Sequence, residues 1–386
     1  MTSGRPNRTS LPEILARSPV RVAYGAGRLG ELGAFARDEG ALRVLLVSDA
    51  GLVAAGHVSR AVAALESAGL HVTLFDGARE NPTTEQVAAG LTLGTDQHVD
   101  FIIGLGGGSS MDCAKGINIL LTNGGEIADY WGVNKTTQPM LPMILVPTTA
   151  GTGSEAQSFA LISDPATHQK MACGDRRSPR DGGLRPRVAI LDPELSRTAP
   201  AAVAKAAGID AISHAVETAG SNARNDTSRQ MSREAWLRLE RAFPRSIESP
   251  RDAAAHADMI LGAHLAGAAI EQSMLGAAHA CANPLTAHFG ITHGVAVGLL
   301  LPQVVRYNAA AGSNPYTDLC EDVGELIERI HALLRCCDWP HGLRPLGVEA
   351  ERLPELAEQA AEQWTARFNP RPVNAADLLE IYRASL

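Results

Sequence analysis

The sequence predicts a protein of two domains, an α/β domain over residues 1–195 followed by an all-helical domain over residues 196–386. In the first half, short apolar runs alternate with helical patterns, which is typical of parallel strands joined by helices that cover both faces of a sheet. After Pro193 the composition shifts to alanine, leucine, glutamate and arginine, with apolar residues at helical spacing and few β-branched runs. A chain of 386 residues also favours two domains.

Strands are expected where a short apolar run ends at Gly, Asp or Pro, because these residues punctuate regular structure. A helix is expected over Val53–Ala68, with Gly69 placed to end it. In the second half, long helices are expected over Ser228–Ala242 and Ala253–Ala280. The expected strands are Val20–Tyr24, Val44–Ser48, Val72–Phe75, Phe101–Leu105, Met143–Val146 and Val188–Leu191, the last of which closes the α/β domain.

The composition argues against nucleic-acid binding and against a membrane location. The net charge is −8, whereas nucleic-acid binding needs a basic excess. Five arginines cluster between Arg176 and Arg187, but Gly and Pro surround them, which favours a solvated loop. No run approaches the roughly 18 apolar residues of a membrane span, and the first residues lack the apolar core of a secretory signal. Six scattered cysteines without a CxxC pair fit a reducing compartment, so a cytoplasmic protein is expected.

Two glycine-rich segments compete as phosphate-binding loops. Gly25–Gly30 has the form GxGxxG after a strand, with Asp49 about 20 residues further on, as a dinucleotide-binding motif requires. Gly104–Lys115 leads a buried strand into three consecutive glycines and then a helical pattern, which Ser109 or Ser110 is placed to cap. A helix N-terminus offers free N–H groups and a positive dipole to a diphosphate. This mechanism favours the second segment, and the alternative for either is a tight turn.

A third segment, Val146–Glu155, also follows a strand and is rich in hydroxyl groups and glycine. Open α/β sheets bind ligands at the carboxyl ends of their strands. An ordinary capped loop would have the same composition, so the segment considered by itself leaves both interpretations open.

Four residues of the helical half form a candidate metal site. Asp210 and His214 are four residues apart, which on a helix places both side chains on one face. His279 and His293 both lie among small apolar residues. An exposed Asp–His pair and two hydrogen-bonded core histidines are the structural alternatives. One carboxylate with three imidazoles suits Fe²⁺ or Zn²⁺, and the ligand types do not choose between the two metals.

These segments together resemble the iron-containing (group III) alcohol dehydrogenases. Gly106–Lys115 resembles the family signature GGGSxxDxAK, and Val146–Glu155 resembles PTTAGTGSE. The four metal candidates match the family's ligands in order, the first two in the context GxDAxxHAxE and the last two in HxxxxP(x8)HG. The resemblance runs from about Tyr24 to the C-terminus. It implies a Rossmann-like N-terminal domain and a helical C-terminal domain, which together form the dehydroquinate synthase-like fold.

The resemblance also implies the cofactor site. It places the pyrophosphate on the second glycine segment, which makes Gly25–Gly30 a structural turn. Asp49 matches the position that meets the adenosine ribose, where a carboxylate accepts hydrogen bonds from the ribose and repels a 2′-phosphate, so NAD is favoured and NADP is the alternative. The cofactor contacts implied in this way are Asp49, Gly106, Gly107, Gly108, Ser109, Asp112, Thr148, Thr149 and Lys170.

The chain departs from the family pattern in two places. Many members carry a second histidine four residues after the third ligand, where this chain has Asn283, which hydrogen-bonds but does not shuttle a proton at neutral pH. His288 is the candidate to take over that catalytic role, with a surface or packing role as the alternative. The segment Cys173–Arg187 is longer and more basic than usual.

The expected function is that of a metal-dependent alcohol dehydrogenase or aldehyde reductase, which transfers a hydride between a primary or secondary alcohol and NAD(P). The alternatives on the same fold are a glycerol or polyol dehydrogenase, a dehydroquinate-synthase-like lyase and a metal-free maleylacetate-reductase-like enzyme. The intact ligand set weighs against the last. A non-catalytic nucleotide-binding protein is the alternative from another class. The expected partners are a small alcohol or aldehyde and a second copy of the chain in a homodimer.

Overall fold

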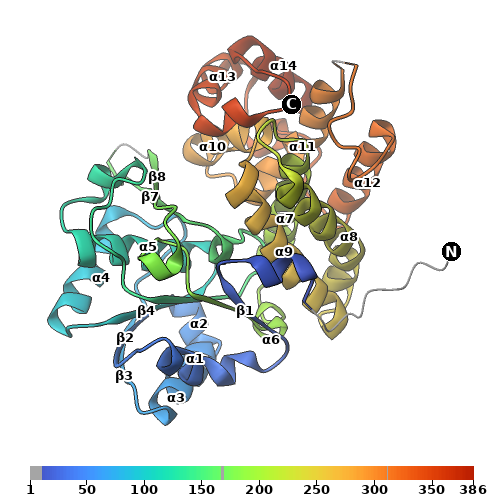
Figure 1. Ribbon diagram of the computed structural model, residues 1–386. Helices are drawn as coiled ribbons and strands as arrows, with labels where there is room; N and C mark the ends of the chain where they lie inside the picture. The colour runs from blue at the N-terminus through green and yellow to red at the C-terminus, as the bar shows by residue number, and fades with distance from the viewer. Residues whose placement is uncertain (1–10, 167–168, 311) are drawn as a thin grey trace. The chain divides into compact units, whose positions relative to one another are not determined.

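The computed structural model describes residues 11–166, 169–310 and 312–386, and the chain divides into two compact units (Figure 1). Unit 1 runs to Thr149 and takes in Gly153–Ala199 and His256–Ile260. Unit 2 takes in Ala150–Thr152, Pro200–Ala255 and Leu261–Leu386.

Unit 1 is built on a six-stranded parallel sheet with the strand order β1-β9-β6-β4-β2-β3. Every strand predicted from the sequence is present, with bounds within one residue. Strands β4 and β9 are buried along their whole length, as expected when helices cover both faces of a parallel sheet. The strands are β1 (Arg21–Tyr24), β2 (Arg43–Val47), β3 (His71–Phe75), β4 (Phe101–Gly106), β6 (Met143–Pro147) and β9 (Val188–Leu191).

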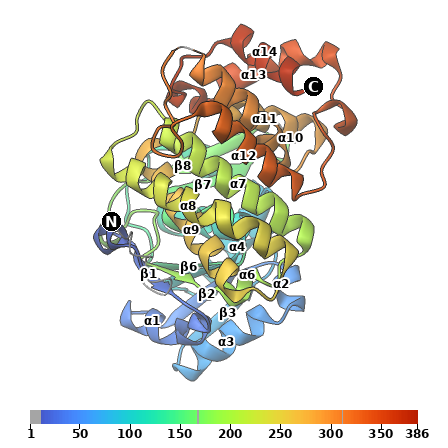
Figure 2. The ribbon, with the colours of Figure 1, turned by 90° about the vertical axis from the view of Figure 1, so that its right-hand side faces the viewer.

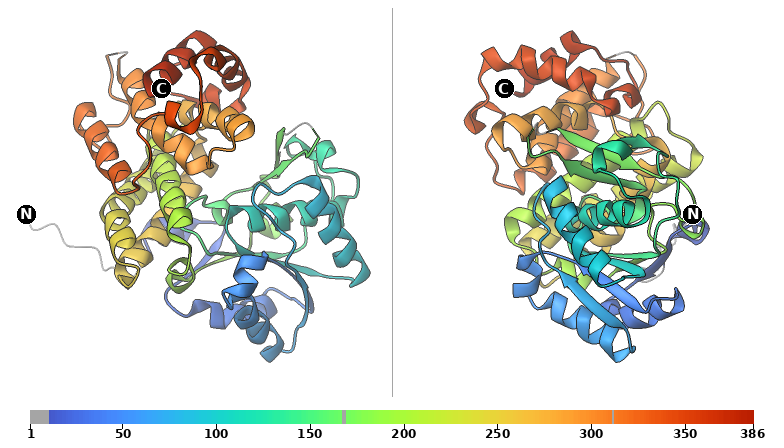
Figure 3. Two further views of the ribbon diagram at one scale, coloured as in Figure 1. Left: turned by 180° about the vertical axis from the view of Figure 1, so that it is seen from behind. Right: turned by 90° about the vertical axis from the view of Figure 1, so that its left-hand side faces the viewer.

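Helices cover the two faces of this sheet in pairs, and alternate residues of each strand serve the two cores. Val44 and Leu46 of β2 pack in the core of α1 (Leu32–Asp38) and α3 (His57–Ser67). Leu45 and Val47 pack instead in the core of α4 (Thr84–Asp96) and α5 (Gly108–Asn123), on the opposite face. Figures 1 and 3 show the two helix layers on either side of the sheet.

Two details of unit 1 differ from the predictions. A second sheet, of strand order β5-β8-β7, was not predicted; it consists of β5 (Gly132–Val133), β7 (Phe159–Ser163) and β8 (Lys170–Gly174). The single helix predicted over residues 53–68 is wrong: the chain forms α2 (Ala50–Ala54) and then α3. Gly56 separates them with a φ of 78°, a left-handed conformation that ends α2 and that glycine adopts at little cost.

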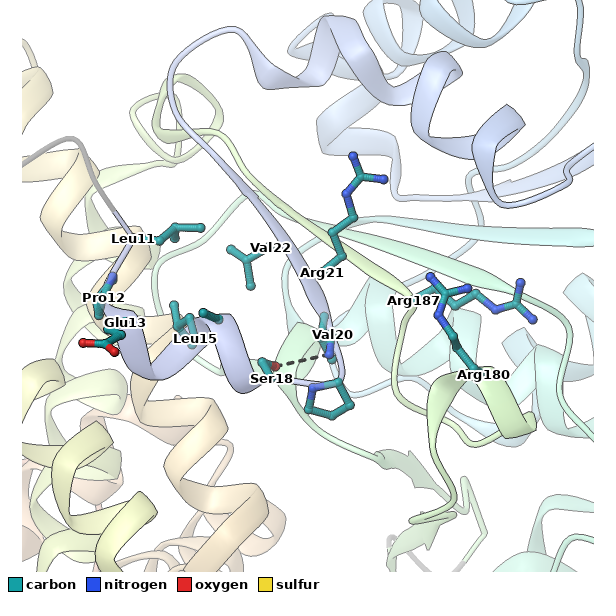
Figure 4. Close-up of a pocket in the computed structure, with 12 residues that line it drawn as sticks. Leu11, Pro12, Glu13, Leu15, Ser18, Val20, Arg21, Val22, Arg180 and Arg187 are labelled. Carbon is teal, nitrogen blue, oxygen red and sulfur yellow. Dashed lines mark hydrogen bonds between the residues drawn. The ribbon is translucent and has the colours of Figure 1, made fainter.

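The arginine-rich segment is not simply a solvated loop. Arg177 forms an ion pair with the buried Asp175 (Nη2–Oδ2, 2.6 Å). Arg180 and Arg187 both reach the side chain of Glu39, at 3.2 and 3.4 Å, and that side chain is 5% exposed. The same two arginines, together with Arg21 and other residues between Leu11 and Val22, line a cavity of about 480 Å³ (Figure 4). The residues lining this cavity include none of the predicted site residues.

Unit 2 is helical, and Figure 2 shows α7, α8, α10 and α11 together with the C-terminal helices. Helix α7 packs along α8 and α11, and α10 packs on α11 and α13. The helices are α7 (Ala201–Gly220), α8 (Asp226–Glu248), α9 (Ala253–Ser273), α10 (Ala277–Phe289), α11 (His293–Ala309), α12 (Val323–Arg335), α13 (Leu353–Glu362) and α14 (Ala375–Ser385); α6 (Pro193–Ser196) precedes them in unit 1. Shorter 3₁₀ helices lie at Glu13–Arg17, Arg28–Glu31, Ile127–Tyr130, Ser154–Ala156, Pro179–Asp181, Arg344–Leu346, Ala350–Arg352 and Trp364–Phe368.

The long helix predicted over residues 253–280 is two helices. Helix α9 ends at Ser273, where Met274 takes a φ of 65°, and α10 begins at Ala277 after Gly276. The break places His279 in the first turn of a separate helix. Among the described residues, α9 is the one helix long and apolar enough to cross a membrane, and most of it is buried within the folded chain, as in a core helix.

Candidate dinucleotide and metal sites

The second glycine segment forms the turn from β4 into α5. Gly107 is the N-cap of α5, and among the described residues no side-chain hydrogen bond caps the helix there, so the prediction that Ser109 or Ser110 caps it is wrong. Both serines lie in the first turn instead. The N-terminus of this 16-residue helix therefore has no side chain bonded at its N-cap, and it provides N–H groups and a positive dipole for an anion.

The backbone of this turn lies close to its neighbours. A Cβ at Gly106 would lie 2.4 Å from Oγ of Ser110, so only glycine fits there. A Cβ at Gly107 would lie 3.5 Å from Oγ1 of Thr149, which places that hydroxyl beside the turn. The N–H of Thr148 donates to the carbonyl of Gly106 (2.9 Å). Both predicted threonines therefore lie next to the glycine turn.

Asp49 also lies beside the start of α5. It follows β2, which is the neighbour of β4 in the sheet, and its Oδ2 accepts a hydrogen bond from Oγ of Ser110 (3.1 Å). Its Oδ1 accepts from the N–H of Leu52 (3.1 Å), which caps α2. The carboxyl edge of an open parallel sheet is where such folds bind ligands, so Asp49, the glycine turn and the threonines form one candidate binding surface.

Asp112 and Lys115 connect α5 to the loop around Ser154. Oδ1 of Asp112 accepts from Oγ of Ser154 (2.7 Å), and burial raises the pKa of the Asp112 carboxyl group despite the nearby lysine. Lys115 is fully buried, and its Nζ donates to the carbonyl of Ser154 (2.7 Å), to Oγ of Ser154 (2.8 Å) and to the carbonyl of Phe159 (2.8 Å). The side chain of Asp112, predicted as a cofactor contact, is thus engaged with a neighbouring loop. Lys170 lies at the start of β8, where its Nζ donates to Oδ1 of Asn81 (3.1 Å).

The first glycine segment binds a carboxylate of the protein itself. The fully buried Asp192 accepts hydrogen bonds from the N–H groups of Gly27 (3.2 Å) and Leu29 (3.0 Å). Gly27 has a φ of 77°, which the turn requires. An internal carboxylate therefore takes the amides that a phosphate would need, and the segment is a structural turn.

The four predicted metal ligands converge in unit 2. Helix α7 carries Asp210 and His214, α10 carries His279, and α11 begins at His293. Oδ1 of Asp210 lies 3.2 Å from Nε2 of His214, 3.4 Å from Nε2 of His279 and 3.8 Å from Nε2 of His293. The rings of His214 and His279 stack with their centroids 4.8 Å apart.

This cluster fits a divalent cation. Oδ1 of Asp210 and Nε2 of His279 are buried and have no hydrogen-bond partner among the described residues. Burying such atoms unpaired costs free energy, which a bound cation would offset. Ligand atoms of Asp210, His279 and His293 all lie within 4.8 Å of one another, close enough to share one ion. A carboxylate with imidazoles is a donor set for Fe²⁺ or Zn²⁺.

The electrostatics of the cluster favour an ionised Asp210. Burial opposes ionisation, but the three surrounding histidines outweigh it and hold the pKa of Asp210 well below its ordinary value. Burial likewise opposes protonation of His279, but Glu217 and Asp210 outweigh it and raise the pKa of His279 to about 9.

Sequence reasoning assigned no role to Glu217, whose Oε2 lies 2.5 Å from Nδ1 of His279. The available signal was its spacing, seven residues after Asp210 and three after His214 on one helix face.

Two family models cover most of the chain. Residues 19–193 match the model described as iron-containing alcohol dehydrogenase, and residues 204–386 match that of the C-terminal part of the Fe-containing alcohol dehydrogenase family. The chain belongs to the iron-containing alcohol dehydrogenase family. It is therefore an oxidoreductase, and the resemblance and the fold class predicted from the sequence are confirmed.

Similar proteins act on several small alcohols and aldehydes, as their names state. The chain is 30% identical to an NAD-dependent methanol dehydrogenase of Bacillus methanolicus, over 95% of this chain and 98% of that one. It is 33% identical to a 1,3-propanediol dehydrogenase of Citrobacter freundii, over 93% and 95%. Among solved structures, a 1,3-propanediol oxidoreductase matches with a TM-score of 0.89 and 32% identity, covering 95% of this chain and 98% of that one. A sulfoacetaldehyde reductase from Bifidobacterium kashiwanohense in complex with NAD⁺ matches with a TM-score of 0.85 and 28% identity, over 95% and 97%.

The two predicted catalytic residues of this family member take different places on α10. Asn283 lies one turn after His279 on the same face, and its Nδ2 donates to Oε1 of Gln363 (3.0 Å). His288 lies nine residues after His279, on the opposite face. It is exposed, and its Nε2 contacts Oε1 of Gln359 (2.6 Å). The structure therefore does not bring His288 to the metal cluster.

Replacing His288 with alanine is expected to leave catalysis nearly unchanged. A substitution at an exposed position with one polar neighbour changes a free energy by at most about 0.5 kcal/mol. Applied to the activation barrier, this is about a twofold change in kcat. Steady-state kinetics of H288A and the wild type measure this directly. A loss of kcat of more than about tenfold would restore His288 as a catalytic residue.

Proposed function

We propose that this chain is an NAD-linked, metal-dependent alcohol dehydrogenase that interconverts a primary or secondary alcohol and its aldehyde or ketone. The supporting observation is the convergence of Asp210, His214, His279 and His293 around unpaired buried ligand atoms. These residues would hold Fe²⁺ or Zn²⁺. Such a cation, when bound, supplies Lewis acidity that lowers the pKa of an alcohol hydroxyl and stabilises developing negative charge.

The chain's own residues provide binding and orientation. In this proposal Gly106, Gly107 and Gly108 at the N-terminus of α5 would bind the diphosphate, and Ser109, Thr148, Thr149 and Lys170 would make further cofactor contacts. Asp112 supports the site indirectly, through Ser154. When bound, NAD would supply the hydride acceptor, C4 of its nicotinamide, and the hydroxyl proton of the alcohol would pass to solvent. Asn283 carries no titratable group, so its side chain does not take that proton.

Asp49 is expected to set the preference for NAD over NADP. Serine at this position retains an N-cap acceptor for Leu52 but removes the charge that repels a 2′-phosphate. We expect D49S to lose about ten- to hundredfold in its NAD:NADP ratio of kcat/KM, since a hydrogen bond to a charged group contributes about 1.5–3 kcal/mol. Kinetics with both cofactors measure the ratio. An unchanged ratio in a folded D49S would contradict the role of Asp49.

The proposed activity is tested by following NADH absorbance with a panel of alcohols and polyols. The panel should include methanol, propane-1,2-diol, propane-1,3-diol and glycerol, and the reverse reaction should use the matching aldehydes. NADH formation that disappears on chelation and returns with Fe²⁺ or Zn²⁺ is the expected result. Binding of NADH without turnover of any substrate would favour the non-catalytic alternative. Activity that survives chelation would favour a metal-free, maleylacetate-reductase-like enzyme.

We also propose that the enzyme works as a homodimer in the cytoplasm. The six cysteines are all free thiols, which suits a reducing compartment such as the cytoplasm. Light scattering after size-exclusion chromatography would test the dimer.

A further inference from the structure

The N-terminus of α10 is bound by side chains from elsewhere in unit 2. The N-cap of α10 is Gly276, which has no side chain to offer. Oε1 of Glu217, from α7, accepts a hydrogen bond from the N–H of Ala278 (2.7 Å). Oδ1 of Asn369 accepts one from the N–H of Ala277 (3.2 Å). These two side chains satisfy helix N–H groups that α10 cannot satisfy itself.

The same glutamate also contacts the candidate metal ligand. Oε2 of Glu217 lies 2.5 Å from Nδ1 of His279, and the side chain of Glu217 is 3% exposed. A carboxylate only accepts hydrogen bonds, so Nδ1 of His279 carries the proton and Nε2 faces Oδ1 of Asp210. Glu217 thus meets two donors, one on the backbone of α10 and one on its histidine.

We propose that Glu217 is a positioning residue for the metal centre: its two carboxylate oxygens fix the orientation of α10 and the tautomer of His279, so that Nε2 presents its lone pair to the cation. The inference rests on the proposed metal-dependent function. Outer carboxylates that bind a ligating histidine orient its ring and raise its strength as a ligand.

Gly276 is shaped for this arrangement. A Cβ at this position would lie 3.1 Å from Oε1 of Glu217 and 3.0 Å from Oδ1 of Asn369. A side chain would therefore crowd both acceptors at the point where they reach the helix amides. The glycine allows the two side chains to approach the N-terminus of α10 together.

The discriminating variant is Glu217→Gln. Glutamine has nearly the same shape but only one acceptor oxygen, and its other terminal group is a donor. In the orientation of Glu217, where the two donors face different terminal atoms, it can accept from Ala278 or from His279 but not from both. If its amide NH₂ group faces Nδ1, the proton of His279 must move to Nε2, where it blocks the metal.

The experiment compares E217Q with the wild type and with Glu240→Gln as the matched control. Glu240 of α8 pairs with Arg329 of α12, so E240Q also breaks a partly buried ion pair in unit 2. The readouts are competitive titration with Zn²⁺ and with Co²⁺, the visible spectrum of the Co²⁺ form, NADH binding and thermal unfolding. We expect E217Q to lose about ten- to hundredfold in metal affinity and to change the Co²⁺ spectrum, with NADH affinity unchanged. E240Q should keep wild-type metal affinity.

A purely structural role for Glu217 would lower the unfolding temperature and leave metal affinity and the Co²⁺ spectrum unchanged, and that result would overturn the proposal. If E217Q does not fold, ¹⁵N NMR of Zn²⁺-loaded wild-type protein provides the second test. A proton on Nδ1 of His279 supports the proposal, and ligation through Nδ1 overturns it. Failure of the wild type to bind Zn²⁺ or Co²⁺ would instead refute the proposed function itself.

Discussion

Replacing His279 with alanine is expected to abolish metal retention and alcohol oxidation while NADH binding persists. The change removes one of four converging ligands and leaves the buried carboxylate of Glu217 without its imidazole partner. Lewis-acid assistance contributes several kcal/mol, so turnover should fall by at least about 10³-fold. Unit 1 carries the glycine turn and contains none of the four ligands, so the dinucleotide site stays intact.

Metal content per chain, NADH formation and NADH titration measure the three parts of this expectation. His288→Ala is the matched control, because it removes a histidine from the exposed face of the same helix. Full metal occupancy and normal turnover in H279A would refute the assigned ligand set.

Replacing Lys115 with methionine is expected to cause a large loss of stability in unit 1. Methionine fills similar space but removes three hydrogen bonds of 2.7–2.8 Å from a fully buried ammonium group. It also leaves the carboxylate of Asp112, whose Oδ1 lies 3.9 Å from Nζ, without a positive neighbour at that place. Removing one member of a buried charged network costs about 3–5 kcal/mol. Ser154 belongs to the same segment as the proposed cofactor contacts Thr148 and Thr149, so loss of its bonds to Lys115 should also weaken NADH binding.

Chemical denaturation followed by a probe in unit 1 measures this loss. The control is Lys205→Met in unit 2, where Nζ pairs with the exposed Asp338 (3.1 Å) and donates to the carbonyl of Cys337 (3.1 Å). An ion pair with an exposed partner contributes at most about 1 kcal/mol, so the loss in K205M should be smaller than in K115M. A K115M protein that unfolds within about 1 kcal/mol of the wild type would show that the buried network contributes little to stability.

The parts of the fold that sequence predicted best are those that depend on local pattern. Strands such as Phe101–Gly106 are continuous apolar runs because helices cover both faces of the sheet, so their positions can be predicted from the sequence. The helix breaks at Gly56 and Met274 depend on single backbone angles, which apolar spacing does not report. The small sheet of β7 and β8 forms through antiparallel pairing and was missed.

The candidate site likewise has parts that the sequence predicted and parts that it did not. The four ligands were predictable because they occur in motifs with fixed spacing. The buried charged groups that contact the candidate sites were not predictable, because they come from distant segments of the chain. Asp192 accepts from the N–H of Gly27, Lys115 donates to the carbonyl of Ser154, and Glu217 contacts the ring of His279. Only the folded chain shows that these buried charged groups bind backbone amides, carbonyls and a ligand ring.

The most direct test of the metal centre is X-ray absorption at the metal edge of anaerobically purified enzyme. One iron or zinc per chain is expected, surrounded by imidazole nitrogens and a carboxylate oxygen at about 2.0–2.2 Å. Catalytically active protein without bound metal, or a metal with sulfur ligands at about 2.3 Å, would contradict a centre built from Asp210, His214, His279 and His293.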